Sequence, residues 1–377
     1  MPLLDIFDEL PDPRAENRRY PLPHLVFIAV CMTLCNADDW EMVSYLAKKK
    51  LNWLRRYIPL PHGVPSHDTF SRVFSRIDPQ AFNQCFITWT NEIAKKTQGE
   101  VIAIDGKTLR RSYDRENGKA AIHMVNAWAS QTGMVMGQLK TAEKSNEITA
   151  IPQLLDMLEI SGCIISIDAM GCQKSIAQKI IEKEGDYLLA VKGNQGHLYD
   201  DIKLFLDDLS SKESTGNTVS YHETLDKDHG RIEIRRCWVS NDIDWLDQKD
   251  DWKNLTMIGV VEGERHEGDQ ISIARRYFIS SLKTGAEHFM DAVRSHWSVE
   301  NNLHWVLDIG FREDENRIRK DHGPENMAIF RQMAINLLKQ EKSVKLGVKN
   351  RRTLAAADDD YRDLLLQGTL SGSGQMR

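Results

Sequence analysis

Two aspartates in this 377-residue chain follow apolar runs, where a charged side chain is unusual. Asp105 follows residues 101–104 in VIAIDGK, and Asp168 follows a similar run in CIISIDAM. Burying a carboxylate among apolar side chains costs free energy unless a cation or hydrogen-bond donors compensate for it. If the two runs are neighbouring strands, both carboxylates face one pocket and a divalent cation would relieve their repulsion. The alternative is two unrelated, solvated aspartates at strand ends.

A third carboxylate lies in RSHWSVENNLHWVLDIGF (294–311), which has the apolar spacing of a helix. The apolar face of that helix is formed by Val299, Leu303 and Val306. Glu300 lies at the margin of this face, where we expect it to be partly buried. It shares a stripe of i, i+4, i+8 spacing with His296 and His304. The stripe lacks the HExxH spacing of zinc enzymes, and carboxylate-rich partners favour Mg²⁺ or Mn²⁺.

Two strand aspartates and a helical glutamate suit phosphoryl transfer assisted by two divalent ions. Two ions about 3.5–4 Å apart activate the attacking oxygen and stabilise the departing one. Such chemistry needs acidic ligands alone, which agrees with a sequence that has neither a GxSxG motif nor a Walker loop. We expect Asp105 to bridge the two ions and Gly106 to leave backbone space for a phosphodiester.

The pattern of apolar residues predicts the elements that must position these acids. Residues 1–97 have the spacing of helices, with N-caps at Ser66 and at Asp78, which is followed by Pro79. From residue 98 the pattern changes to strands. The expected elements are strands at 101–107, 121–130 and 133–141, a helix at 150–160, a strand at 163–170, a helix at 173–184, a strand at 187–193 and a helix at 197–209.

This order, βββαβαβα, is typical of a ribonuclease H-like α/β fold with a mixed sheet, in which strands one and four can lie side by side. Four further strands predict a β-rich insertion at about 210–285, and a helical stretch follows over 286–339. The sequence therefore divides into an all-helical domain at 1–97, an α/β domain at 98–340 that carries the insertion, and a basic, partly flexible tail at 341–377.

Composition and charge narrow the class of protein. With 41% hydrophobic and 28% charged residues the chain is typical of a globular protein, and its longest apolar run, 25–35, is too short to span a membrane. No secretory signal is visible, and six scattered cysteines without CxxC spacing favour reduced thiols. The net charge of −6 is uneven, because residues 200–252 hold 14 acidic and 7 basic residues whereas 339–352 nets +5. Overall charge therefore does not exclude a DNA partner.

Seven stretches of the chain, in a fixed order, resemble the motifs of a known family. They are VPSHDTFSRVFSRIDPQAF (64–82), AIDGKTLRRS (103–112), KSNEITAIPQLL (144–155), IDAMGCQKSIAQKI (167–180), YLLAVKGNQ (187–195), HGRIEIR (229–235) and HWSVENNLHWVLDIGFRED (296–314). The family is that of the H-repeat-associated DDE transposases of bacterial insertion sequences, and the resemblance covers nearly the whole chain. It implies a ribonuclease H-like catalytic domain with a β-rich insertion, behind a helical associated domain.

The resemblance puts the family's catalytic acids on Asp105, Asp168 and Glu300, and it implies two Mg²⁺ or Mn²⁺ ions as cofactors. The implied activity is cleavage of double-stranded DNA at the ends of the element, followed by joining of the 3′-hydroxyl to target DNA. A homodimer on DNA is expected, in the bacterial cytoplasm and at the nucleoid when DNA is bound. Two alternatives stay open: an inactive relic that at most binds DNA, and a metal-dependent nuclease without strand transfer.

One departure from the broader relatives concerns their Tyr-Arg-Glu-Lys signature around the glutamate. The matching positions here are Val293, His296, Glu300 and Leu307. The DNA contacts of the signature Arg and Lys are therefore in question, and Arg294, His296 or Arg312 could substitute. Trp297 is expected to pack in the core.

Further candidates for DNA contact follow the strands and the insertion turn. They are Lys107 and Arg110 after the first aspartate, Lys192 and Asn194 after the fifth strand, and His229 and Arg231 in the insertion. Basic side chains at such places can bind phosphate. Each pair also has a structural interpretation: a solvated surface for the first, turn residues for the second and the closure of a hairpin for the third.

Overall fold

The computed structural model describes residues 2–15, 18–94, 99–113, 120–141, 147–211, 219–228 and 230–370. The chain forms two compact units. Unit 1 comprises residues 1–96, 106–145 and 299–377, and unit 2 comprises residues 97–105 and 146–298. The chain passes from unit 2 to unit 1 directly after Asp105 and again directly before Val299.

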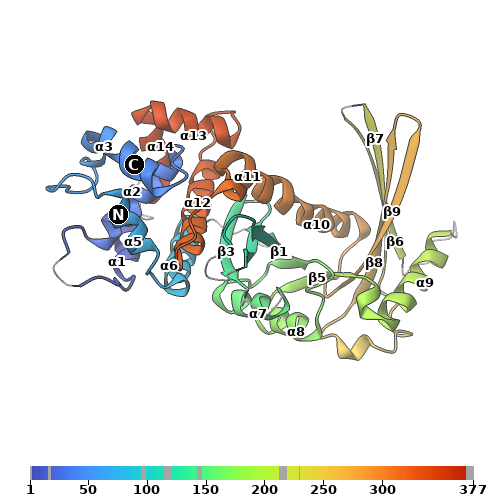
Figure 1. Ribbon diagram of the computed structural model, residues 1–377. Helices are drawn as coiled ribbons and strands as arrows, with labels where there is room; N and C mark the ends of the chain where they lie inside the picture. Colours follow the sequence, from blue (N-terminus) through green and yellow to red (C-terminus); the bar gives the residue numbers. More distant parts are fainter. Residues whose placement is uncertain are drawn as a thin grey trace, which may run out of the picture. The chain divides into compact units, whose positions relative to one another are not determined.

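The strands of the described residues form one mixed sheet (Figure 1). They are β1 (Val101–Leu109), β2 (Ile122–Ala129), β3 (Met134–Lys140), β4 (Ile164–Ile167), β5 (Asp186–Val191), β6 (Val219–Asp228), β7 (Arg231–Ser240), β8 (Met257–Glu267) and β9 (Gln270–Ser280). Their order is β3-β2-β1-β4-β5-β9-β8-β7-β6. β1, β4 and β5 are parallel, whereas β2 and β3 are antiparallel. The first five strands therefore have the ribonuclease H-like order, which confirms the sequence prediction.

The central strands of unit 2 are apolar along their whole paired length. Residues 101–104 of β1 pair with residues 164–167 of β4, and all but one of these eight residues are hydrophobic and buried. Such runs are typical of parallel strands that are covered on both faces. On the other side β5 pairs with β9, so the insertion strands β6–β9 extend the main sheet. The sequence predicted these four strands but not that they would join this sheet.

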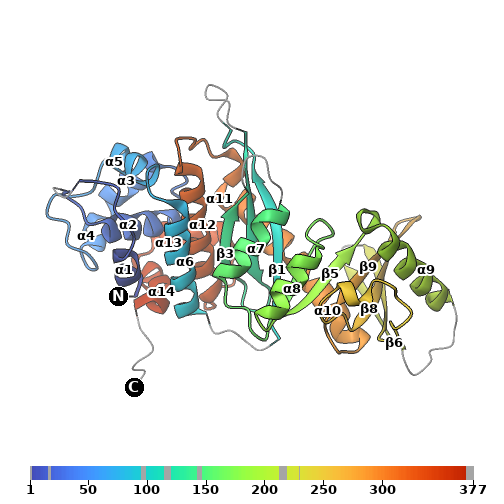
Figure 2. The same cartoon turned by 90° about the horizontal axis from the view of Figure 1, so that it is seen from below.

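The helices of unit 2 are α7 (Glu147–Met157), α8 (Lys174–Glu182), α9 (His197–Ser211) and most of α10 (Ala286–Val299). α7 and α8 precede β4 and β5 and pack against each other (Figure 2). α10 buries Phe289, Met290 and Val293 in one core cluster with residues of β7, β8 and β9. This packing holds the insertion strands to the helix that leads to Glu300.

Unit 1 contains the remaining helices. They are α1 (Pro2–Asp8), α2 (Leu22–Leu34), α3 (Trp40–Lys49), α4 (Leu51–Leu54), α5 (His67–Phe74), α6 (Pro79–Ile93), α11 (Trp305–Phe311), α12 (Gly323–Gln340), α13 (Val348–Ala357) and α14 (Asp359–Leu370). The predicted caps are confirmed: Ser66 accepts a hydrogen bond from the Thr69 N–H, and Asp78 accepts one from the Gln80 N–H. α12 is buried from residue 323 to residue 338 and packs on α2, α6 and β3.

The N-terminal helices share their core with helices from the end of the chain. Phe330 of α12 packs edge-on against Phe74 and Phe82, with ring centroids 4.8 and 5.2 Å away. Two more helices, α13 and α14, lie in the segment to which the sequence analysis assigned no element. Arg352 of α13 is 1% exposed and donates to the Thr33 carbonyl at 2.8 Å. The burial of Arg352 was missed because a basic segment usually indicates a solvated surface.

Candidate functional site

Asp105 and Asp168 occupy equivalent positions on neighbouring parallel strands of unit 2. Ile104 of β1 pairs with Ile167 of β4; Asp105 is the next residue of β1, and Asp168 directly follows the last residue of β4. Neighbouring strands lie about 4.8 Å apart, so the register sets the two residues side by side. Both side chains are partly exposed. The structure thus brings together two of the three predicted acids within this unit.

Asp168 is oriented by the backbone that follows it. Its Oδ1 accepts hydrogen bonds from the N–H groups of Met170 at 3.0 Å and of Gly171 at 3.2 Å. This is an Asx turn, which fixes the carboxylate relative to the end of the strand. A Cβ atom at Gly171 would lie 2.3 Å from Cγ2 of Ile167, so the close approach of this turn to β4 requires glycine.

A second loop fastens the turn that carries Asp168. The Asn194 side-chain amide, in the turn η1 (Gly193–Gln195) after β5, donates to the Ala169 carbonyl at 2.9 Å. The Gln195 amide donates to the Cys172 carbonyl at 2.6 Å. The sequence analysis did not predict this contact of Asn194 with Ala169, the residue next to Asp168.

Glu300 begins a single π-helical turn, η3 (Glu300–His304), between α10 and α11 in unit 1. π turns in otherwise α-helical stretches often occur at functional sites. Val299 and Leu303 are buried as predicted, but the Glu300 side chain is 56% exposed, so the expectation of partial burial is wrong. The 3.6-residue period on which that expectation rested does not hold across a π turn.

His304 lies against Glu300, with Nδ1 3.3 Å from Oε2 of the carboxylate. Burial lowers the pKa of the His304 imidazole below its ordinary value, and the Glu300 carboxylate opposes this effect incompletely. The imidazole is therefore neutral at pH 7, and a neutral imidazole carries one N–H donor. His296, the third residue of the predicted stripe, is partly buried on α10 in unit 2.

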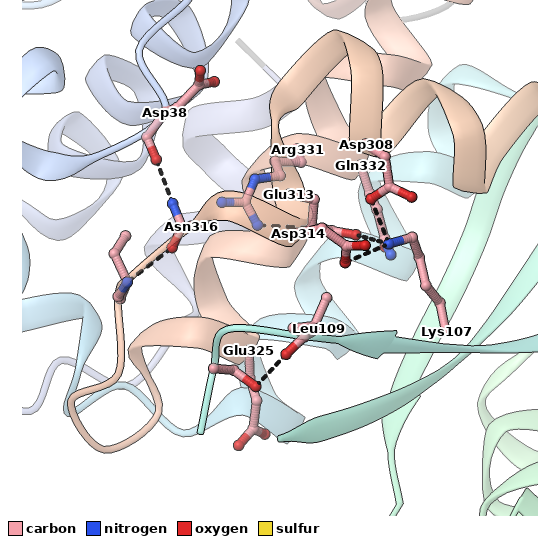
Figure 3. A network of polar contacts seen from close by, with 12 residues as sticks. Asp38, Lys107, Leu109, Asp308, Glu313, Asp314, Asn316, Glu325, Arg331 and Gln332 are labelled. Atoms are coloured by element: carbon pink, nitrogen blue, oxygen red, sulfur yellow. Dashed lines mark hydrogen bonds and ion pairs between the residues drawn. The ribbon is translucent and has the colours of Figure 1, made fainter. Parts of the chain in front are cut away.

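Lys107 is enclosed by carboxylates of unit 1 (Figure 3). Its Nζ lies 2.7 Å from Asp308, 3.3 Å from Asp314 and 3.4 Å from Glu313, and its side chain is 8% exposed. Burial alone would lower the pKa of the ammonium, but the three carboxylates outweigh burial and raise it above its ordinary value. This burial contradicts the alternative, left open by the sequence, that Lys107 lies on a solvated surface.

The other basic candidates are partly or largely exposed, and four of them face a carboxylate. The pairs are Arg110–Asp314 at 3.0 Å, Arg231–Glu233 at 3.3 Å, Arg294–Asp226 at 3.5 Å and Arg312–Glu315 at 2.9 Å. Exposed ion pairs of this kind contribute little to stability, so their cations can exchange a carboxylate for another anion. Lys192 is exposed in the turn after β5, and His229 lies outside the described residues.

Two tryptophans near the glutamate face solvent. Trp297 of α10 is 45% exposed, and the Arg276 guanidinium lies 4.4 Å from the centre of its ring, so the expectation that Trp297 packs in the core is wrong. The buried face of α10 is already filled by residues such as Val293 and Val299. Trp305 of α11 is 60% exposed and was not singled out from the sequence. Its position off the apolar face formed by Val299, Leu303 and Val306 was the available signal.

The donor atoms of the site suit a hard divalent cation. Asp105 and Asp168 offer carboxylate oxygens from strands in register, and Mg²⁺ and Mn²⁺ prefer such ligands. Two like charges at neighbouring positions are also more stable with a cation between them.

Among the described residues, none of the helices has the length and apolar character needed to cross a membrane.

Two family models together match most of this chain. The family model described as "Transposase DDE domain" matches residues 96–337, and the model described as "DDE_Tnp_1-associated" matches residues 4–90. "Putative transposase YncI" of Escherichia coli O157:H7 is 41% identical over 369 residues, which cover 97% of this chain and 94% of the relative. "H repeat-associated putative transposase YhhI" of Escherichia coli K12 is 40% identical over 380 residues, covering 99% and 98% of the two chains.

A solved structure, of piggyBac transposase in a synaptic complex with hairpin DNA, aligns with 99% of this chain and 78% of its own at a TM-score of 0.41 and 13% identity. The domain model covers more than half of the chain, and both relatives align with it over nearly their whole length. This chain therefore belongs to the DDE transposases, among their H repeat-associated members.

Proposed function

We propose that this protein is a DNA transposase that cuts double-stranded DNA at the ends of a mobile element and joins the freed 3′ ends to target DNA. The observation that carries the proposal is the register of β1 and β4, which sets Asp105 and Asp168 side by side on a ribonuclease H-like sheet. Membership of the DDE transposase family supports the same activity and the use of a divalent metal.

We assign metal binding to Asp105, Asp168 and Glu300. When bound, two Mg²⁺ or Mn²⁺ ions would supply electrophilic assistance to both the attacking and the departing oxygen of a phosphodiester. Strand pairing next to Asp105 and the Asx turn of Asp168 hold these carboxylates before metal arrives, which lowers the ordering cost of binding. The exposed Glu300, with His304 at 3.3 Å, offers the third carboxylate from a helix.

DNA would be held by exposed cations and exposed aromatic rings. The candidate cations are Arg110, Lys192, Arg231, Arg294 and Arg312. The pairing of the four arginines with carboxylates keeps their surface neutral until phosphate displaces those carboxylates. Trp305 presents a ring face on which a nucleobase can stack. We propose that residues 98–340 provide catalysis and residues 1–97 an associated domain, and that two copies act together on DNA at the bacterial nucleoid.

A cleavage and strand-transfer assay tests the proposal. The full chain is mixed with labelled DNA that carries the two ends flanking its gene, an unlabelled target plasmid, and Mg²⁺ or Mn²⁺. We expect end cleavage followed by labelled target, and we expect both to be lost in Asp105→Asn and Asp168→Asn. Asp251→Asn is the matched control, because Asp251 is an exposed carboxylate that pairs with Lys174 at 2.6 Å.

The outcomes separate the alternatives. Cleavage without labelled target indicates a nuclease without strand transfer, and DNA binding without cleavage indicates an inactive relic. Full cleavage by Asp105→Asn would contradict the assigned mechanism altogether. Mn²⁺ binding measured by calorimetry on the same variants gives a second readout, which does not depend on the choice of DNA.

A further inference from the structure

Unit 1 contains a buried series of alternating charges (Figure 3). Lys107 on β1 and Arg331 on α12 face the same carboxylate from two directions. Lys107 Nζ is 3.4 Å from Glu313 Oε2, and Arg331 Nη1 is 3.3 Å from Glu313 Oε1. The Glu313 and Arg331 side chains are each 2% exposed. The cluster therefore belongs to the interior and is not part of a phosphate-binding surface.

The position of the cluster in the chain relates it to the proposed acids. Lys107 is two residues after Asp105, and its shortest contact is with Asp308, eight residues after Glu300 on the helical stretch that continues as α11. Arg331 belongs to α12, in which residues 323–338 are all buried. The cluster thus joins the strand that continues from one acid to the helix that continues from another.

Stability alone does not account for such an arrangement. Desolvating several charges is expensive, and apolar residues of similar volume are often equally stabilising or more so. Charge-assisted hydrogen bonds instead fix one geometry, because each donor must point at its acceptor. A lysine held by three carboxylates also has little freedom to leave them for a passing phosphate.

We propose that Lys107 is a positioning residue for the metal site. Its ammonium, through Asp308, Asp314 and Glu313, sets the strand behind Asp105 against the helix behind Glu300 and against α12. The proposal rests on the proposed function, since it concerns the same acids. It goes beyond that function because it assigns Lys107 a role in orienting the metal ligands and no role in DNA binding.

Lys107→Met and Arg110→Met form a matched pair for the test. Both remove one cation that faces Asp314, but Arg110 is 78% exposed whereas Lys107 is 8% exposed. Mn²⁺ affinity is measured by calorimetry, and kcat and KM by cleavage of a labelled element end. Outer residues that orient metal ligands typically change metal affinity by about 10–100-fold, and we expect Lys107→Met to weaken Mn²⁺ binding by at least about tenfold. We expect kcat to fall in the same variant while KM for DNA stays unchanged.

Arg110→Met should leave Mn²⁺ affinity unchanged. Wild-type Mn²⁺ affinity in Lys107→Met, or a change confined to KM for DNA, would overturn the proposal.

If Lys107→Met does not fold, two further variants still test the proposal. Asp308→Asn removes the negative charge at the 2.7 Å contact, at a side chain that is 33% exposed, and Lys107→Met/Asp308→Asn removes one charge of each sign. A folded double variant that still binds Mn²⁺ weakly supports positioning, because the charge balance has been restored without the geometry. A double variant with wild-type Mn²⁺ affinity shows that charge balance alone mattered and contradicts the proposal.

The same measurements separate this inference from the proposed function. A wild-type protein that binds Mn²⁺ and cleaves, beside a Lys107→Met variant that does so equally well, refutes the inference alone. A wild-type protein that neither binds Mn²⁺ nor cleaves removes the proposed function and the inference together.

Discussion

The Asn194 amide touches the backbone of Ala169, the residue next to one of the proposed metal ligands. Asn194 follows the strand beside β4, so its single hydrogen bond holds one loop to another at the carboxyl ends of the strands. Ligands of α/β sheets usually bind at these ends. A side chain that holds two such loops together can change the rate of the reaction without contacting the substrate.

Asn194→Ala is therefore predicted to slow cleavage without weakening DNA binding. Losing one neutral hydrogen bond costs about 1 kcal/mol, which corresponds to roughly a fivefold change if it acts on the transition state. The measurement is kcat and KM for cleavage of a labelled end. Lys192→Ala is the comparison, because its exposed ammonium should affect KM and the dependence of binding on salt. A KM effect in Asn194→Ala with unchanged kcat would contradict this role.

At single positions, the sequence predicted the candidate acids, which depend on residue type. It did not predict the burial of side chains, which depends on distant neighbours. Asp105 and Asp168 were identifiable because a charge after an apolar strand is unusual in any fold. The burial of Lys107 was not predictable, since its three carboxylates come from residues about 200 positions further along the chain. Trp297 was placed wrongly because a helix pattern does not show which neighbours cover each face, and Glu300 because the pattern assumed an α-helical period at a π turn.

At the scale of elements, three helices meet at one carboxylate near the end of the chain. Glu341, at the end of α12, accepts hydrogen bonds from Arg351 of α13 and, at 3.1 Å, from the Tyr361 hydroxyl of α14. Arg351 also donates to Tyr361 at 2.8 Å. Burial alone would raise the pKa of the Glu341 carboxyl, but hydrogen bonds from Ser343, Tyr361 and Arg351 outweigh burial and hold the pKa below its usual range.

A lowered carboxyl pKa makes this contribution to stability dependent on pH. The contribution is fully present above the unfolded-state pKa of about 4.3 and is lost as the pH falls through the lower folded-state pKa. Glu341→Gln should thus destabilise the protein by about 1.5–3 kcal/mol at pH 7, because it weakens hydrogen bonds to a charged group. Thermal unfolding of both proteins at pH 7 and near pH 3 is the measurement. A difference that does not shrink at the lower pH would show that the carboxylate charge is not responsible.

Elements were predictable where local signals agree. The caps at Ser66 and Asp78 and the apolar strands depend on residues close in sequence, and they appear where the sequence indicates. The helices α13 and α14 pack instead on helices from the start of the chain, α2 and α1. The basic composition of residues 339–352 pointed to solvent, whereas Arg351 is buried against Glu341 and Tyr361, and Arg352 against the carbonyl of Thr33, far away in the chain.

For the whole molecule, unit 1 is built from three separate stretches of chain. The N-terminal helices enclose α12, and Phe330 of that helix supplies the ring against which Phe74 and Phe82 pack. A single core made by distant segments folds cooperatively, and its parts lose most of their buried area when separated.

Residues 1–97 expressed alone are therefore predicted not to form a stable domain. Circular dichroism and proton NMR of the fragment should show helix without a cooperative thermal transition and with poor dispersion of side-chain signals. The full chain is the control, and it should unfold cooperatively. A fragment with a sharp transition and dispersed signals would show that these helices are independent of α12.

The buried arginines of α13 and α14 have a consequence for gene copies that carry a late stop codon. Arg352 donates to the Thr33 carbonyl and to Asp38, and the Arg362 guanidinium lies 4.6 Å from the centre of the Trp53 ring. A premature stop codon shortly before these positions spares every proposed catalytic acid yet removes contacts on which the first helices depend. We expect copies of the gene with such late stop codons to encode proteins that do not fold and are degraded. These copies would still encode all three proposed catalytic acids.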